Sequence, residues 1–287
     1  MKSPEFHDGI PEIGEYHKLL TTSFFKEIED FSNEFLRINK IHLANYSEKW
    51  VVDPLHQWSR QWEYPYVLSK LSAYAFLNSS QKLTILDAGS GLTFFPFFLE
   101  SRLKGSEIHC CDHDASLAHA VASINRKQNA QVQFQMASLD RTEFHEEFFD
   151  CIYCISVLEH TDDYQNILDE FYRIMKPGGI LLLTFDISID GRGEISPSSV
   201  NKLVWEVENR FAFASNNIGD VLPLLKNPNI WTTGEAGRIN PSLLPWKKHP
   251  SLWRRLETFI TKGKVLKYPP PYTVSCLSLI KTSPKVV

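Results

Sequence analysis

The sequence predicts an α/β protein whose core is a doubly wound, mainly parallel β-sheet. Short apolar runs alternate with helical stretches across residues 82–186, which is the pattern of βαβ units. The apolar run at residues 83–87 ends in an acid and is followed by two glycines and a helical stretch. A final apolar run, Tyr272–Ile280, has the composition of one more strand.

The middle zone predicts five strands, at Leu83–Asp87, Glu107–Cys111, Val132–Gln135, Cys151–Ile155 and Ile180–Phe185. Three helices fit between them, at Thr93–Lys104, Ala115–Gln128 and Tyr164–Met175. Lys176–Gly179 indicates a sharp stop, because Pro and Gly commonly lie just past a helix C-terminus. Ligands of such a sheet bind outside the carboxyl ends of its strands.

The two flanking zones differ from each other. Residues 1–80 are expected to be mainly helical, with interruptions at Pro54 and Pro65. Residues 187–271 are irregular and rich in Pro, Gly and Trp. They carry the rings of Trp205, Phe211, Phe213, Trp231, Trp246 and Trp253. These rings either form the wall of a pocket for an aromatic, apolar or sugar-like molecule or simply pack the segment.

The composition is that of an ordinary globular protein. A formal net charge of -4 gives no general attraction to nucleic acid or anionic membranes, and no apolar run is long enough for a membrane span. The N-terminus lacks the apolar core of a signal peptide, and the five cysteines do not suit a disulfide framework. A cytoplasmic location is therefore expected. Cys151 and Cys154 would point to opposite faces of a strand, which argues against a metal site there.

The glycine turn after the first strand is the segment most indicative of chemistry. Asp87 closes the strand, and Gly89, Ser90 and Gly91 lead into a helix whose first N–H groups are free for a ligand. The third glycine of a nicotinamide-binding G-x-G-x-x-G fingerprint is replaced by Phe94. A carboxylate at this position would repel a pyrophosphate, whereas it suits a ligand that carries an ammonium group.

A second acid, Asp112, ends the second strand, 25 residues beyond Asp87. An acid there can accept hydrogen bonds from both hydroxyls of a ribose. Asp114 precedes the next helical stretch and is expected to cap it.

Six segments follow one another in a characteristic order: Asp87–Gly91, Asp112, Ala137–Leu139, Phe149–Tyr153, Val157–His160 and Met175–Gly179. Together they resemble the class I S-adenosylmethionine-dependent methyltransferases, particularly those that act on small molecules. The resemblance implies a Rossmann-like sheet of seven strands with the last strand, near residues 272–281, antiparallel. With the flanking zones it suggests a helical N-terminal cover (1–80) and a methyltransferase domain (81–287). In that domain a cofactor half (82–186) precedes a substrate-facing insert (187–271).

The resemblance also implies which residues would hold S-adenosylmethionine. They are Asp87, Gly89, Ser90, Gly91, Asp112, His113, Ser138, Leu139 and Ile155. The acid and glycines would surround the methionine part, Asp112 would bind the ribose, and Ser138 and Leu139 would lie beside the adenine. His113 would stack on the adenine or simply start a surface helix. Ser138 stands where many relatives have an Asp, and Thr93 where the family has a third glycine.

His160 is the residue expected to act as a base, because it follows the fourth strand and a hydroxyl acceptor must lose its proton. The alternative is that Glu159 and His160 only order the loop before the next helix. The Asn/Asp-Pro-Pro-aromatic tetrapeptide of amide and adenine N-methyltransferases is absent. The corresponding segment has the sequence Ile155-Ser-Val-Leu. A metal-dependent site of the catechol type would need acids after both the fourth and the fifth strand. Asp186 follows the fifth strand, but no matching Asp follows the fourth, so no metal is expected.

The N-terminal zone places Trp58, Arg60, Trp62 and Tyr64 within a short run. Residues 55–66 are expected to lie over the cofactor, with Arg60 paired to its methionine carboxylate. At least one of the three rings is expected to line the acceptor pocket, and Trp62 or Tyr64 would face the sulfonium or the acceptor through cation–π attraction. The alternative is an amphipathic helix whose rings belong to the core.

These observations predict methyl transfer from S-adenosylmethionine to a small-molecule acceptor, most simply on oxygen or nitrogen. The alternative is a catalytically silent methyltransferase fold that serves as a binding module or partner subunit. No nucleic-acid or membrane partner is expected.

Overall fold

The computed structural model describes residues 4–49, 53–78, 82–161, 163–192, 195–215, 221–246 and 268–282. These residues form a seven-stranded sheet in the order β3-β2-β1-β4-β5-β7-β6. The strands are β1 Thr84–Ala88, β2 Glu107–Asp112, β3 Gln133–Met136, β4 Phe149–Ile155, β5 Met175–Ser188, β6 Ala212–Phe213 and β7 Tyr272–Ile280. Strands β1 to β5 are parallel and β7 is antiparallel to β5. This confirms the predicted fold class.

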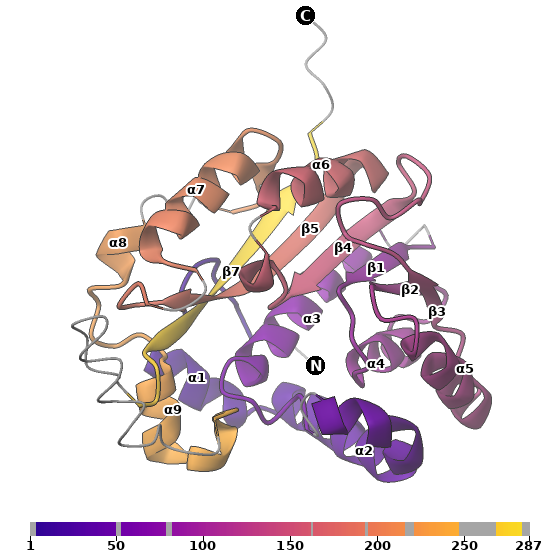
Figure 1. The fold of residues 1–287 in the computed structure, drawn as a ribbon, viewed down its shortest axis with the longest axis horizontal. Coiled ribbons are helices and arrows are strands. Elements are labelled where there is room, and N and C mark those ends of the chain that lie inside the picture. The colour runs from indigo at the N-terminus through magenta and orange to yellow at the C-terminus, as the bar shows by residue number, and fades with distance from the viewer. Residues whose placement is uncertain are drawn as a thin grey trace, which may run out of the picture.

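Helices cover both faces of the sheet (Figure 1). They are α1 Ile13–Leu20, α2 Ser23–Lys49, α3 Arg60–Leu77, α4 Phe95–Arg102, α5 Leu117–Gln128, α6 Tyr164–Ile174, α7 Pro197–Glu208, α8 Val221–Leu224 and α9 Thr233–Ile239. Helices α3, α4 and α5 pack on one face, and α6 and α7 pack on the other. Cys151 belongs to the first core and Cys154 to the second, so the two cysteines do point to opposite faces of β4.

The helix stop expected at Lys176–Gly179 is confirmed, but these four residues lie inside β5 and not before the strand predicted at Ile180–Phe185. Helix α6 ends at Ile174, and the strand begins at the next residue. The backbone N–H of Gly178 donates to the carbonyl of Lys281 at 2.8 Å, and the N–H of Lys281 donates to the carbonyl of Gly179 at 3.0 Å. Pairing with the chain beyond β7 therefore extends the strand through a Pro-Gly-Gly sequence that is locally unfavourable for it.

Pro65 lies inside α3 and does not interrupt it as expected. The proline removes one backbone donor, but its fixed φ is compatible with a helix. Every residue from Gln61 to Ser69 is buried. Burial on all sides stabilises the helix by more than the lost hydrogen bond costs, which is why tertiary packing overrides the local signal.

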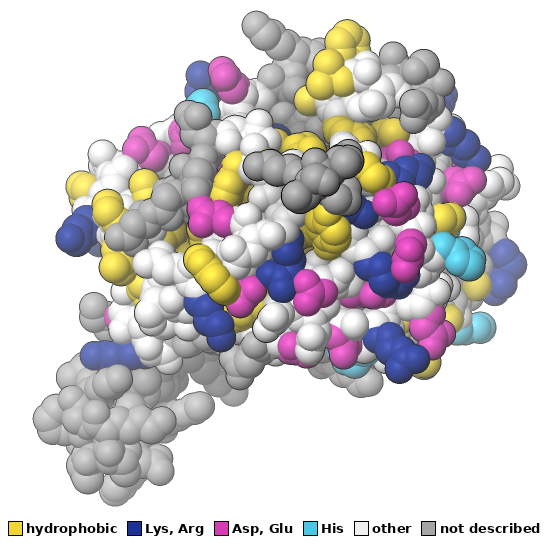
Figure 2. All heavy atoms as spheres, turned by 90° about the horizontal axis from the view of Figure 1, so that it is seen from above, with side chains coloured by type: hydrophobic (Ala, Val, Ile, Leu, Met, Phe, Trp, Pro, Cys, Tyr) yellow, Lys and Arg dark blue, Asp and Glu magenta, His cyan; other side chains and the backbone are white. Residues whose placement is uncertain are grey.

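The N-terminal helices share one hydrophobic core with a face of the sheet. Helix α3 contacts β4, β5 and β7 directly, and Gly9 forms an antiparallel bridge with Cys276 of β7. The division of the chain near residue 80 stays a prediction. None of the helices in the described ranges is long and apolar enough to cross a membrane. On the face that Figure 2 shows, cationic and anionic side chains are interspersed.

Candidate functional site

A cavity of about 720 Å³ opens at the carboxyl ends of β1, β2, β3 and β4. It is lined by all nine residues of the central domain that were expected at the cofactor: Asp87, Gly89, Ser90, Gly91, Asp112, His113, Ser138, Leu139 and Ile155. Its volume is in the range of small-molecule and cofactor sites. The structure thus brings the expected residues together, and their contacts with a cofactor stay a prediction.

The glycine turn is held in a backbone conformation that other residues rarely adopt. Gly89 has φ +74° and Gly91 has φ +53°. A Cβ atom on Gly89 would lie 2.6 Å from Cγ2 of Val157, and one on Gly91 would collide with the hydroxyl of Tyr46. Both glycines are therefore required by the fold itself. Tyr46, on α2, is a lining residue that no local sequence pattern predicts.

Asp112 organises the cavity where β2 ends. Its Oδ2 accepts a hydrogen bond from the backbone N–H of Gly91 at 2.9 Å, and its Oδ1 accepts one from the N–H of Asp114 at 3.0 Å. Oδ1 also lies 3.2 Å from Nδ1 of His113, whereas Oδ2 keeps a further lone pair for a ligand hydroxyl. Asp114 accepts from the N–H and hydroxyl of Ser116, so it caps the turn before α5, which begins at Leu117. The two acids thus differ in role as expected.

Asp87 is a buried acid at the end of β1, with only 5% of its surface exposed. Burial raises the pKa of Asp87 to about 8, while the nearby Tyr153 hydroxyl opposes the rise and the Asp112 charge adds to it. A buried carboxyl with so high a pKa gains when a cation is placed beside it. Asp87 therefore fits the ammonium group of an amino-acid moiety.

Arg60 lines the cavity but is already paired with a residue that sequence analysis missed. Its Nη1 lies 2.5 Å from Oε2 of Glu63, which is fully buried. Oε1 of Glu63 accepts hydrogen bonds from Ser156 at 2.7 Å and from Thr184 at 2.5 Å. Nη1 of Arg60 also donates to Ser156, a residue held at φ +47°. The guanidinium is thus fixed at the end of β4, and its charge is balanced.

Two of the three rings expected at the cavity line it, namely Trp58 and Tyr64. The expectation for Trp62 is wrong, because this ring packs edge-on against Phe6 at 4.9 Å in the core. Helical geometry explains the difference. Residues four apart, such as Arg60 and Tyr64, share a helix face, whereas a residue two positions on points to the opposite side.

The C-terminal segment contributes two further rings. Trp246 and Tyr272 line the cavity and stack with centroids 5.7 Å apart. Trp231 instead stacks on Tyr16 at 3.7 Å in the core, and Trp205 is exposed on α7. Phe211 is buried and Phe213 lies in the edge strand β6, away from the cavity lining. Trp253 falls outside the described residues.

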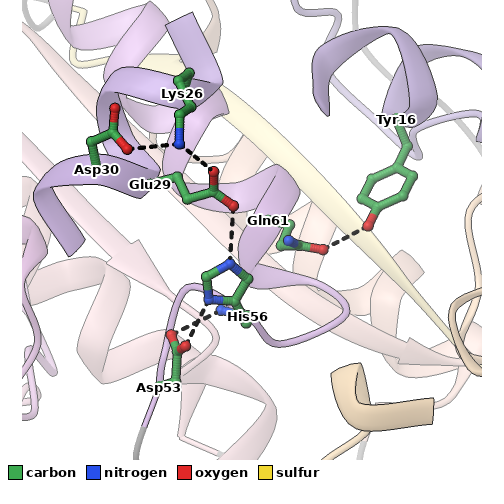
Figure 3. A network of polar contacts seen from close by, with 7 residues as sticks. All are labelled: Tyr16, Lys26, Glu29, Asp30, Asp53, His56 and Gln61. Carbon is green, nitrogen blue, oxygen red and sulfur yellow. Dashed lines mark hydrogen bonds and ion pairs between the residues drawn. The ribbon is translucent and has the colours of Figure 1, made fainter. Parts of the chain in front are cut away.

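The loop before α3 is tied to α2 by a polar network (Figure 3). The His56 ring lies 2.6 Å from Oδ2 of Asp53 through Nδ1 and 3.2 Å from Oε1 of Glu29 through Nε2. Lys26 extends the network from Glu29 to Asp30. The hydrogen bond to Asp53 is the main reason that the pKa of His56 is raised to about 8. These contacts fix the segment that includes the lining residues Pro54, Gln57, Trp58 and Ser59.

A second group of ionisable side chains lines the cavity beside β4 and β5. Glu159 and His160 belong to the short helix Leu158–His160 after β4, and Asp186 lies near the end of β5. His160 is exposed, whereas Glu159 is 6% exposed and its Oε2 has no hydrogen-bond partner among the described residues. In the part of the chain that the structure describes, no cluster of His, Cys, Asp and Glu is arranged to hold a metal ion.

Comparison with known proteins gives a family for the central region. Residues 86–183 match the family described as a methyltransferase domain. A tRNA U34 carboxymethyltransferase of Sulfurimonas denitrificans is 34% identical over 77 residues, 26% of each chain. Phosphoethanolamine N-methyltransferase 1 of Triticum aestivum is 27% identical over 110 residues, 38% of this chain and 21% of that one. The chain thus spans about a quarter or less of the length of these relatives.

Among solved structures, geranyl diphosphate C-methyltransferase from Streptomyces coelicolor A3(2) aligns with a TM-score of 0.46 at 14% identity, covering 77% of this chain and 84% of that one. The sheet order, the glycine turn and the match to the methyltransferase domain together support a class I S-adenosylmethionine-dependent methyltransferase domain around residues 86–183.

Proposed function

We propose that this protein transfers a methyl group from S-adenosylmethionine to a small-molecule acceptor, on nitrogen or oxygen. The observation that supports this most is the cavity itself. One half of it combines Asp87, the glycine turn and Asp112, whose chemistry suits an amino-acid group and a ribose. The other half is walled by rings and by Glu159, His160 and Asp186, which leaves room for a second molecule.

The chain's own residues would hold the cofactor through four kinds of contact. Asp87 pairs with the ammonium group, and Asp112 accepts from the ribose hydroxyls. Ser138, whose hydroxyl donates to Asp140, keeps an acceptor lone pair for the adenine amino group. Arg60 donates to the carboxylate through Nε and Nη2, since its hydrogen bonds to described residues all use Nη1.

The bound cofactor supplies an activated methyl group on a sulfonium sulfur. The protein's task is then to align the acceptor, exclude water and manage the acceptor's proton. Trp58, from the loop before α3, lines the cavity and would help to exclude water from it. Exposed at the cavity rim, His160 can pass a proton to solvent, which is the role expected for it with a hydroxyl acceptor.

Methyl-labelled S-adenosylmethionine, incubated with the protein and separate pools of small amines, phenols, carboxylic acids and bulk tRNA, tests the proposal. We expect label in a small-molecule pool and in no other. Binding of S-adenosylhomocysteine without transfer to any pool would instead support the binding-module alternative. Label in tRNA alone would contradict a small-molecule acceptor.

A further inference from the structure

Resting on the proposed function, we propose that the acceptor is a cationic amine held by Glu159 and Asp186 against the rings of the cavity, so that the reaction is N-methylation. Three independent features support this assignment: the place of these acids in the sheet, the charge balance of the cavity and the nature of its walls.

Glu159 and Asp186 lie on the half of the cavity that the cofactor residues leave open. The glycine turn, Asp112 and Ser138 follow β1, β2 and β3, which are neighbours in the sheet. Glu159 follows β4, and Asp186 lies on β5, on the opposite side of β1. A molecule placed beside the cofactor therefore meets these two acids.

Acidic side chains outnumber Lys and Arg in the cavity lining. Its described residues include five acids, Asp87, Asp112, Asp114, Glu159 and Asp186, whereas Arg60 is the one Lys or Arg among them. The Arg60 charge lies beside buried Glu63, at 2.5 Å, and Glu159 and Asp186 also act on it. Asp87 and Asp112 have cofactor groups to bind, and Asp114 caps a turn. Glu159 and Asp186 are the acids of the acceptor half, and in their ionised forms they repel an anionic acceptor and attract a cationic one.

The walls of the same half present aromatic faces. Trp246 and Tyr272 line the cavity and are stacked on each other, and Tyr272 lies on β7, which pairs with β5, the strand of Asp186. A ring face beside a carboxylate is the combination that binds alkylammonium groups, because both attract positive charge and the ring also contacts the carbon substituents.

Because Glu159 is buried, its carboxylate is suited to accept the proton that the amine must lose before methyl transfer. Burial raises the pKa of Glu159, and the nearby Arg60 charge opposes that rise. The amine and this carboxyl share one proton, and the pair is neutral overall wherever that proton lies. When the proton moves from nitrogen to the carboxylate, the N–H bond breaks and an O–H bond forms. The electron pair stays on nitrogen as the lone pair that methyl transfer requires.

Binding of three probes of similar size tests the proposal: 2-phenylethylamine, 2-phenylethanol and phenylacetate, titrated by calorimetry into the full chain saturated with S-adenosylhomocysteine. We expect the amine to bind at least about tenfold more tightly than the alcohol, and phenylacetate to bind least. Glu159→Gln should remove most of the amine preference while alcohol binding is retained. Asp186→Asn provides the same test if the first variant does not fold.

Asp112→Asn, in the cofactor half, is the matched control. It should weaken binding of S-adenosylhomocysteine but preserve the ratio of amine to alcohol affinity. Equal binding of amine and alcohol, or an amine preference that survives both Glu159→Gln and Asp186→Asn, would overturn the inference. The proposed function would survive such a result if S-adenosylhomocysteine still binds, and it would fail separately if that ligand does not bind.

Discussion

The backbone N–H of Gly91 donates a hydrogen bond to Oδ2 of Asp112 at 2.9 Å, which joins the turn after β1 to the end of β2. Two segments that are each expected to contact a different part of the cofactor are thus fixed relative to each other before any ligand binds. Such preorganisation lowers the entropic cost of binding.

Asp112→Ala should weaken binding of S-adenosylhomocysteine by about tenfold to a hundredfold, because it removes the expected ribose contact and releases the turn. Isothermal titration measures the change. Glu107→Ala, at the other end of the same strand, removes contacts with Lys82 and His109 and should leave the affinity unchanged. Unaltered affinity in a folded Asp112→Ala protein would refute the ribose assignment.

Gly89→Ala should destabilise the protein by about 3 kcal/mol, because it adds a clash with Val157 to the strain of a positive φ. Gly105→Ala is the control, since Gly105 also has a positive φ but nothing lies within 4 Å of its Cβ position. It should cost only about 1 kcal/mol. Denaturant unfolding measures both. The double variant Gly89→Ala/Val157→Ala should show less than the sum of its single effects, and strict additivity would argue against the clash.

The network around His56 should make stability depend on pH. Its pKa is raised from 6.5 to about 8, so its contribution is fully present below pH 6.5 and is lost as the pH rises through 8. After allowance for solvent screening, His56→Gln should cost about 1 kcal/mol at pH 6 and much less at pH 9. Thermal unfolding at the two pH values tests this, with exposed His119→Gln as the control. An equal loss of stability at both pH values would contradict a stabilising role for the protonated His56 ring.

Binding of S-adenosylhomocysteine should release a proton from Asp87. The free protein keeps this acid protonated below about pH 8, and a ligand ammonium group favours the ionised form. Affinity should therefore rise as the pH increases toward 8. Calorimetry at pH 7 in buffers of different ionisation enthalpy measures the number of protons released on binding. Asp87→Asn should abolish this release, and release that persists in the variant would assign the proton to another group.

The central strands could be predicted because they are buried on both faces and so contain continuous apolar runs, as in Cys151–Ile155 of β4. The glycine turn could be predicted because its residues are contiguous. The start of β5 was predicted too late, at Ile180 and not at Met175, because the pairing of Gly178 and Gly179 depends on Lys281, about a hundred residues away.

The remaining site residues depend on packing between distant segments. Tyr46 reaches Gly91 from α2, and Glu63 meets Ser156 and Thr184 from α3. No local pattern in the sequence marks either contact. Trp62 illustrates a different limit, because a run of rings does not reveal which of them face the cavity until the helix and its phase are known.

Titration of the full chain with S-adenosylhomocysteine tests the central claim most directly, because it examines the cavity without requiring the acceptor. We predict saturable binding at one site per chain, weakened in Asp112→Ala and unchanged in Glu107→Ala. A folded wild-type protein that gives no saturable binding, or binding to which Asp112 is irrelevant, would contradict the account.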